Sequence, residues 1–272
     1  MRLTVAALQS AGVPGDVAAN LDELDRAAAT AAADGAGLLV TPELFVTGYN
    51  IGDRARELAA VGLDERVADI ARRHHIGLVV GAAERDDHDG LHNSAFLVSE
   101  EGELLARHRK AHLFGDLDRG RFEPGPDPVT LTSYRGLSVA LLICYDVEFP
   151  ESVRAAALAG AQAVLVPTAQ MEPFEFVAEQ VIRARAWENQ VYVVYANRTG
   201  QEGDLAYVGR SSIVDPYARV LDSRLDGPGL LSAEIDTDVV AQAQRDNPYL
   251  TDLRTDLFSA GPDATDPPGA DR

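Results

Sequence analysis

The stretch LSVALLICYDVEFPE at residues 137–151 decides the fold that this sequence predicts. Its first eight residues, 137–144, form the most apolar run in the chain, which is typical of a strand buried on both faces. Pro150 then suits the first turn of a helix, because the N–H group that it lacks would have no helical partner there. A buried strand that leads into a helix is the building unit of an α/β fold, and Cys144 falls at the junction.

Outward from this stretch, strand and helix patterns alternate along the chain. Strand-like runs are predicted at 3–10, 38–44, 76–84, 92–99, 103–110, 137–144, 163–169, 191–197 and 229–236. Helices are predicted near 17–31, 53–60, 64–74, 151–161 and 174–190, the last with Val177, Val181, Ala184 and Trp187 on one face. Loops rich in Gly, Asp and Arg are predicted at 114–128 and 199–208.

This organisation predicts one α/β domain over residues 1–258 and a tail over residues 259–272. Because strands and helices mix throughout, we expect helices on both sides of the sheet system. The tail sequence SAGPDATDPPGADR has the composition of a flexible end or of one that lies across a partner. No repeat and no internal linker interrupts the domain.

The composition excludes several classes of function. The 272 residues carry a formal net charge of −19, which disfavours nucleic acid or an anionic membrane as a partner, because both attract Lys and Arg. No apolar run reaches the roughly 18 residues that a membrane span needs, and the N-terminus lacks the pattern of a signal peptide, so we expect a cytoplasmic protein. A single cysteine rules out an intrachain disulfide and a multi-cysteine metal site, and no spaced cluster of His or carboxylates predicts a metal.

Three polar residues end separate strand-like runs. Glu43 ends one, Lys110 ends another, and Cys144 ends the most apolar one. Lys110 is the only lysine in a chain rich in arginine, which suggests a position where a compact ammonium fits and a planar guanidinium does not. Strand ends that meet at one edge of a sheet are where α/β proteins place their chemistry.

Each of these residues also has a structural interpretation, but as a set they are chemically coherent. Alone, Cys144 could be an inert buried thiol, Glu43 a paired carboxylate and Lys110 an exposed edge residue. Together they supply a nucleophile, a general base and a cation for a developing oxyanion. The helix that follows Cys144 favours its thiolate form. His108 and His112 are the better histidine alternatives for the base, and we interpret both as structural.

The motifs around these residues resemble the nitrilase superfamily of carbon–nitrogen hydrolases over roughly residues 2–258. The matching strings are TPELFVTGYN (41–50), RKAHLFG (109–115), LLICYDVEFPE (141–151), VPTAQMEP (166–173) and RARAWENQVYVVYANRTG (183–200). The resemblance implies a four-layer α-β-β-α sandwich and homodimers, or higher homo-oligomers, built by helix packing. It implies that Glu43 is the base, that Lys110 stabilises the oxyanion and that Cys144 is the nucleophile of a thioester mechanism without a cofactor.

One position departs from the pattern of the family. Many relatives carry a second glutamate in the loop after the lysine, and Asp118 stands eight residues past Lys110 in this chain. Glu123 is the alternative in the same loop, and we favour Asp118 as a fourth catalytic residue, although its shorter side chain puts a substrate-positioning role in doubt. The predicted substrate-binding residues are Tyr49, Tyr145, Glu148, Gln170, Met171, Phe174 and Trp187.

The residues after Cys144 separate the branches of the superfamily. Nitrilases tend to have Trp–Glu there, whereas Tyr145–Asp146 resembles the amidase-like branches. The strings HLFGDLDR, CYDVEFPE, MEP and RAWENQ are most similar to bacterial amidases that act on aliphatic or stereochemically defined amides and release ammonia. An N-carbamoyl amide hydrolase is the runner-up, followed by a nitrilase or a non-catalytic scaffold, which would be expected to lose one of the three residues. A nucleotide-binding protein is disfavoured, because SAGVPGDVA (10–18) matches no phosphate-binding loop. Relatives that hydrolyse ω-amides of dicarboxylic acids often carry Arg where this chain has Glu148, so we expect neutral or amine-bearing substrates.

Overall fold

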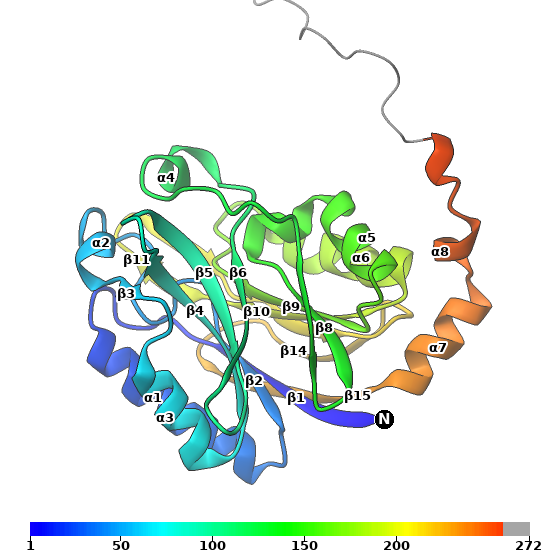
Figure 1. The fold of residues 1–272 in the computed structure, drawn as a ribbon, viewed down its shortest axis with the longest axis horizontal. Helices are drawn as coiled ribbons and strands as arrows, with labels where there is room; N and C mark the ends of the chain where they lie inside the picture. The colour runs from blue at the N-terminus through cyan, green and yellow to red at the C-terminus, as the bar shows by residue number, and fades with distance from the viewer. Residues whose placement is uncertain (258–272) are drawn as a thin grey trace, which may run out of the picture.

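The computed structural model describes residues 1–257 and contains two large β-sheets stacked face to face (Figure 1). The strands of the first sheet are β1 (Arg2–Gln9), β2 (Leu38–Val40), β3 (Ala60–Val61), β4 (Gly77–Arg85), β5 (Leu91–Val98), β6 (Leu104–Arg109) and β15 (Gly229–Asp236). Those of the second are β7 (Thr130–Tyr134), β8 (Leu137–Leu141), β9 (Ala163–Thr168), β10 (Tyr192–Asn197), β13 (Ser211–Val214) and β14 (Val220–Arg224). The strand orders are β15-β1-β2-β4-β5-β6, with β3 beside β4, and β14-β13-β10-β9-β8-β7.

Helices cover the outer face of each sheet. On the first sheet lie α1 (Val17–Ala33) and α3 (Glu65–His74), and on the second lie α5 (Pro150–Leu158) and α6 (Ile182–Asn189) (Figure 1). The shorter elements are α2 (Arg54–Leu58), α4 (Gly115–Arg119), the 3-10 turn η1 (Cys144–Glu148), the π turn η2 (Val177–Val181), the hairpin β11 (Thr199–Glu202) and β12 (Leu205–Val208), α7 (Thr237–Asp246), α8 (Tyr249–Asp252) and the 3-10 turn η3 (Thr255–Leu257). This arrangement confirms the predicted α-β-β-α sandwich.

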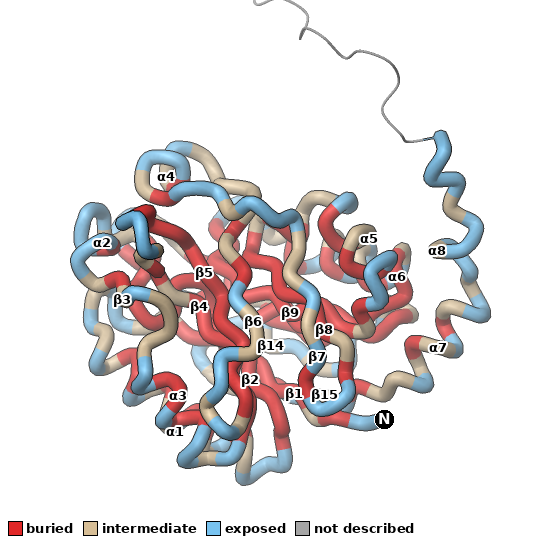
Figure 2. Tube along the Cα trace, viewed as in Figure 1, coloured by how far each residue is buried: buried red, intermediate tan, exposed pale blue. Residues whose placement is uncertain are grey.

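Alternation along the strands explains why four layers form. In β1, Val5 and Ala7 pack between the sheets, whereas Ala6 and Leu8 pack under the helices. Both faces are therefore apolar, and the strand is buried almost throughout (Figure 2). A strand buried on both faces needs a layer on each side, which the facing sheet and the outer helices supply.

The boundaries differ from the sequence expectation in places that concern the site. The run predicted at 38–44 stops pairing at Val40, and the run at 137–144 stops at Leu141, so Glu43 and Cys144 lie in the turns beyond their strands. The loop predicted at 199–208 is instead the hairpin β11–β12, which turns at Gly203 with a φ of +64°. β11 (TGQE) has no apolar residue and β12 (LAYV) has only four, so the pattern did not reveal the hairpin. The predicted tail at 259–272 and residue 258 lie outside the described residues.

The helix predicted at 174–190 buries a different face from the one expected. Its first part is the π turn η2, in which the N–H of Ile182 donates to the carbonyl of Val177 five residues earlier. The wider turn rotates the following residues, so Ala178, Ile182 and Ala186 face the core. Trp187 was expected on the buried face but is 39% exposed.

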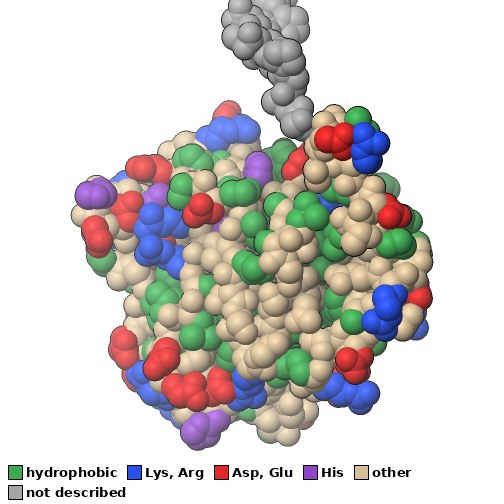
Figure 3. Space-filling view, turned by 45° about the vertical axis from the view of Figure 1, so that its right-hand side comes forward, with side chains coloured by type: hydrophobic (Ala, Val, Ile, Leu, Met, Phe, Trp, Pro, Cys, Tyr) green, Lys and Arg blue, Asp and Glu red, His purple; other side chains and the backbone are tan. Residues whose placement is uncertain are grey.

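The surface mixes both signs of charge. On the face shown in Figure 3, acidic and basic side chains lie close together around the edge, and the centre carries few charges. Among the described residues, no helix is both long and apolar enough to cross a membrane.

Candidate active site

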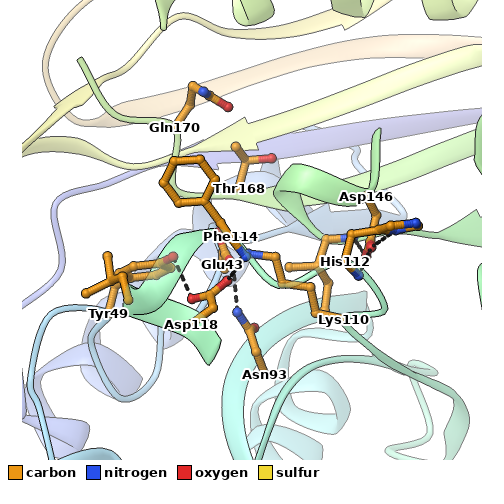
Figure 4. A network of polar contacts seen from close by, with 12 residues as sticks. Glu43, Tyr49, Asn93, Lys110, His112, Phe114, Asp118, Asp146, Thr168 and Gln170 are labelled. Carbon is orange, nitrogen blue, oxygen red and sulfur yellow. Dashed lines mark hydrogen bonds and ion pairs between the residues drawn. The ribbon is translucent and has the colours of Figure 1, made fainter. Parts of the chain in front are cut away.

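A buried ion cluster lies where the turn after β2 meets the loop after β6. Lys110 Nζ donates to Glu43 Oε1 at 2.7 Å and to Asp118 Oδ2 at 2.7 Å, and all three side chains are fully buried (Figure 4). Asn93 Nδ2 donates to the same Glu43 oxygen at 2.7 Å, and the Tyr49 hydroxyl donates to Asp118 Oδ1 at 2.7 Å. Glu43 Oε2 has no hydrogen-bond partner among the described residues, so one oxygen of this carboxylate is free to accept a proton.

Local backbone structure places each of these groups. The N–H of Glu43 donates to the carbonyl of Thr168 on the second sheet, at 3.2 Å. Lys110 continues the pairing of β6 by one residue, because its N–H donates to the carbonyl of Asn93 at 2.8 Å. Asp118 lies in α4 and also accepts from the N–H of Phe114, at 3.0 Å, which closes the loop over the cluster.

Cys144 begins the turn η1 directly after the second sheet's β8 and is 8% exposed. Its φ is +44°, in the left-handed region, which costs a residue other than glycine about 1–2 kcal/mol. Asp146 holds this turn, because its Oδ2 accepts from the N–H of Ile143 at 3.1 Å. The same carboxylate accepts from His108 Nε2 at 3.1 Å and from His112 Nδ1 at 2.8 Å. The two histidines thus tie the lysine loop to the cysteine turn from outside the pocket.

Burial and charge set the protonation of the site. Burial raises the pKa of the Cys144 thiol well above its ordinary value, and the charge of Glu43 raises it further. This direction is opposite to the one expected from a helix N-terminus, and α5 begins six residues beyond Cys144. Burial also raises the pKa of Glu43 despite the opposing charge of Lys110. Burial alone would lower the pKa of Lys110, but the carboxylates around it raise that pKa well above its usual value.

A small pocket opens onto Cys144. Its lining residues are Tyr49, Phe114, Cys144, Tyr145, Glu148, Ala169, Gln170, Met171 and Phe174. Six of the seven predicted substrate-binding residues are among them. Trp187 is the exception, because it lies on the exposed face of α6.

Two lining residues, Phe114 and Ala169, were not predicted. Phe114 belongs to the motif RKAHLFG and Ala169 to VPTAQMEP, so the site residues beside them in these motifs could have indicated both. Glu123, the alternative to Asp118, is exposed, and its backbone N–H donates to the carbonyl of Leu91. The structure therefore brings Asp118, and not Glu123, to Lys110.

Comparison with known proteins places the chain among characterised families. The family model described as Carbon-nitrogen hydrolase matches residues 4–245. The chain is 42% identical to "Hydrolase in pqqF 5'region" of Pseudomonas protegens, with 94% of this chain and 90% of that protein covered. It is 38% identical to the "(R)-stereoselective amidase" of Pseudomonas sp., with 98% and 96% covered.

The fold and the cysteine have solved counterparts. The crystal structure of an amidase from Nesterenkonia sp. superposes with a TM-score of 0.86 at 39% identity, with 94% of this chain and 95% of that chain covered. Variants of this amidase have been solved in complex with butyramide and with acrylamide added covalently at the active-site cysteine. The chain described above therefore belongs to the carbon–nitrogen hydrolase family, within the nitrilase superfamily.

Proposed function

We propose that this chain is an amidase that converts a small aliphatic or amine-bearing carboxamide into a carboxylic acid and ammonia through a thioester on Cys144. The observation that carries the proposal is the arrangement of Glu43, Lys110 and Cys144, in which a buried carboxylate keeps one oxygen free beside a buried thiol. Amide hydrolysis through a cysteine agrees with the relatives, whose structures bind amides.

The first half of the reaction forms the thioester. Glu43 Oε2 takes the thiol proton as Cys144 Sγ attacks the amide carbonyl carbon. An ammonium has three donors, and Lys110 uses two of them on Glu43 and Asp118, so the third is available for the oxyanion, together with the backbone N–H of Tyr145. The protonated Glu43 then gives its proton to the amide nitrogen, the C–N bond breaks, and ammonia leaves.

The second half uses the same groups in reverse. Glu43, again a carboxylate, takes a proton from water, whose oxygen attacks the thioester carbonyl. Lys110 holds the second oxyanion, the C–S bond breaks, and Cys144 Sγ recovers a proton from Glu43. The carboxylic acid is released, and no redox step or cofactor is needed.

Asp118 has a positioning role in this scheme. Its Oδ2 accepts from Lys110 and from the N–H of Phe114, and its Oδ1 accepts from Tyr49. Both oxygens are thus occupied by the protein before substrate enters. A side chain one methylene shorter than glutamate therefore orients the lysine and leaves the substrate to Glu148 and the other pocket residues.

The pocket favours a small substrate without a second carboxylate. Aromatic side chains, Ala169 and Met171 line it closely around Cys144, which suits a short acyl group. Glu148 lines the pocket, and burial raises the pKa of its carboxyl. A substrate carboxylate would meet like charge or an uncompensated polar group here, whereas a substrate amine would gain a partner.

Three further points concern the oligomeric state, the alternative reaction and the location of the enzyme. We propose a homodimer or a higher homo-oligomer in which α5 and α6 pack against a second copy, because Leu158, Phe176 and Trp187 expose apolar surface there. An N-carbamoyl amide hydrolase remains the second candidate, since its substrate also carries a terminal amide. The cytoplasmic location stays a prediction from the sequence.

The test is a screen for released ammonia over simple amides, carbamoyl compounds and nitriles. We expect turnover of short amides, without carbon dioxide, and none by Cys144→Ala. Carbon dioxide released with the ammonia would identify the second candidate. Turnover of nitriles alone would overturn the amidase assignment.

A further inference from the structure

A buried arginine outside the pocket binds the turn that carries Glu43. Arg198 directly follows β10 and is 1% exposed. Its Nε donates to the carbonyl of Glu43 at 3.0 Å, and its Nη2 donates to the carbonyl of Leu44 at 2.7 Å. Its Nη1 donates to the carbonyl of Ala11 at 2.8 Å. One guanidinium therefore fixes two consecutive carbonyls at the proposed base, 155 residues away in the sequence.

The turn needs such support. Leu44 is fully buried and has a φ of +48°, a left-handed conformation that L residues rarely adopt. The backbone of Arg198 also shares an anchor with the base, because the N–H groups of Glu43 and Arg198 both donate to the carbonyl of Thr168. A planar fork that reaches two adjacent carbonyls holds their relative orientation, which a single ammonium cannot do.

Glu202, on the hairpin β11–β12, is the buried acidic partner of Arg198. Its Oε2 lies 3.6 Å from Arg198 Nη1 and accepts from the Tyr207 hydroxyl at 2.7 Å. Its Oε1 accepts from the N–H of Tyr49 at 2.9 Å. The Arg198–Glu202 pair therefore holds both ends of the segment 43–49, with the proposed base at one end and a pocket tyrosine at the other.

We propose that Arg198, with Glu202 as its buried counterion, is a positioning residue for the general base, and that it acts through the backbone carbonyls of Glu43 and Leu44. The proposal rests on the role of Glu43 given under the proposed function. It assigns no contact with substrate to Arg198. The hairpin β11–β12 then has a purpose in catalysis, because it supplies the counterion that keeps a guanidinium buried behind the base.

A similar arginine holds the other catalytic turn. Arg185, on α6, donates through Nε to the carbonyl of Val147 at 2.9 Å and through Nη2 to the carbonyl of Glu148. These carbonyls belong to η1, which begins at Cys144 with a positive φ. Arg185 is a matched control, because its hydrogen bonds hold the turn that carries the proposed nucleophile, whereas those of Arg198 hold the turn that carries the proposed base.

The experiment measures whether the effect of replacing Arg198 on catalysis requires Glu43. Arg198→Lys keeps the charge opposite Glu202 but loses the fork. We expect kcat to fall about 10- to 100-fold with KM changed less than about threefold, since misplacing a catalytic group affects the chemical step. Alkylation of Cys144 by methyl vinyl ketone, a small electrophile without an amide to hydrolyse, is followed by mass spectrometry and should slow by a similar factor.

The decisive measurement repeats the labelling in a Glu43→Gln background. If Arg198 acts through the base, Arg198→Lys should slow labelling there by less than about twofold. Arg185→Lys should slow labelling by the same factor in both backgrounds. An equal factor for Arg198→Lys in both backgrounds, or full activity of Arg198→Lys, would overturn the proposal. Wild-type turnover by Glu43→Gln alone would instead refute the proposed function.

Two further variants guard against simple misfolding. Arg198→Met/Glu202→Gln removes both buried charges together and leaves no unpaired ion, so it tests the same role if Arg198→Lys does not fold. We expect the same loss of kcat from this double variant, and wild-type kcat from it would also refute the proposal. Arg219→Lys alters an ion pair with the buried Asp215 away from the site and should retain wild-type activity.

Discussion

Replacing Lys110 by arginine tests the shape of the buried cation site separately from its charge. The Lys110 side chain is fully buried, and its Nζ lies 2.7 Å from Glu43 Oε1 and 2.7 Å from Asp118 Oδ2. The ring of Tyr49 closes a third side, with its centroid 6.0 Å from Nζ. Lys110→Arg keeps the positive charge but adds a planar group that this space does not accommodate.

The expected loss follows from two contributions. Loss of one oxyanion donor typically lowers kcat about 100- to 1,000-fold, or about 2.7–4 kcal/mol. Overpacking a filled site costs about 1–3 kcal/mol of stability. Lys110→Arg should therefore lower kcat/KM at least about 100-fold and also lower the thermal midpoint.

Lys110→Met provides the comparison, because it removes the charge. Two buried carboxylates would then face each other without a cation, which costs about 3–5 kcal/mol. Ammonia release and thermal unfolding of both variants are the assays. We expect Lys110→Met to be the less stable of the two at neutral pH. If Lys110→Arg keeps more than a third of the wild-type kcat/KM, the site does not require an ammonium and the reasoning fails.

The other predictions concern the nucleophile, a surface histidine and the substrate. Cys144→Ala should fold with native circular dichroism but release no ammonia, and any turnover by it would remove the thioester mechanism. The hydrogen bond to Asp146 raises the pKa of His112 above 6.5, so its stabilising contribution is complete below pH 6.5 and is lost as pH rises through the folded-state pKa. His112→Gln should flatten the fall of the thermal midpoint as the pH rises above 6.5, and an unchanged slope would contradict this expectation. For matched amides with neutral, amino or carboxylate ends, Glu148 predicts the lowest kcat/KM for the carboxylate, and the substrate class is wrong if that amide is best.

The parts of the fold that the sequence predicted are those with an apolar signal. Strands buried on both faces, such as β2 and β8, appear as continuous apolar runs, and the ends of these runs pointed to Glu43 and Cys144. Lys110 was visible because it is the only lysine. These signals are local, and they were enough to bring the three residues to one site.

The parts that the sequence did not predict depend on contacts across the chain. The hairpin β11–β12 pairs a polar strand of four residues with an apolar strand of four, which is too short to give a periodic pattern. Arg198 contacts carbonyls more than 150 residues away, which leaves no local pattern either. Trp187 was misplaced because the π turn η2 adds a residue to one turn, which a fixed period of 3.6 residues does not anticipate.

The charge of the buried cluster gives a physical reason for pairing Cys144 with Glu43 in the proposed mechanism. With both carboxyl groups ionised and the amine protonated, Glu43, Asp118 and Lys110 carry a formal net charge of −1, and all three side chains are buried. Ionising Cys144 by releasing its proton to water would raise this buried charge to −2, which agrees with the raised pKa of the thiol. Moving the proton to Glu43 leaves the net charge at −1. In the proposed mechanism attack and proton transfer are therefore linked, and we expect the geometry of the turn that carries Glu43 to control the reactivity of Cys144.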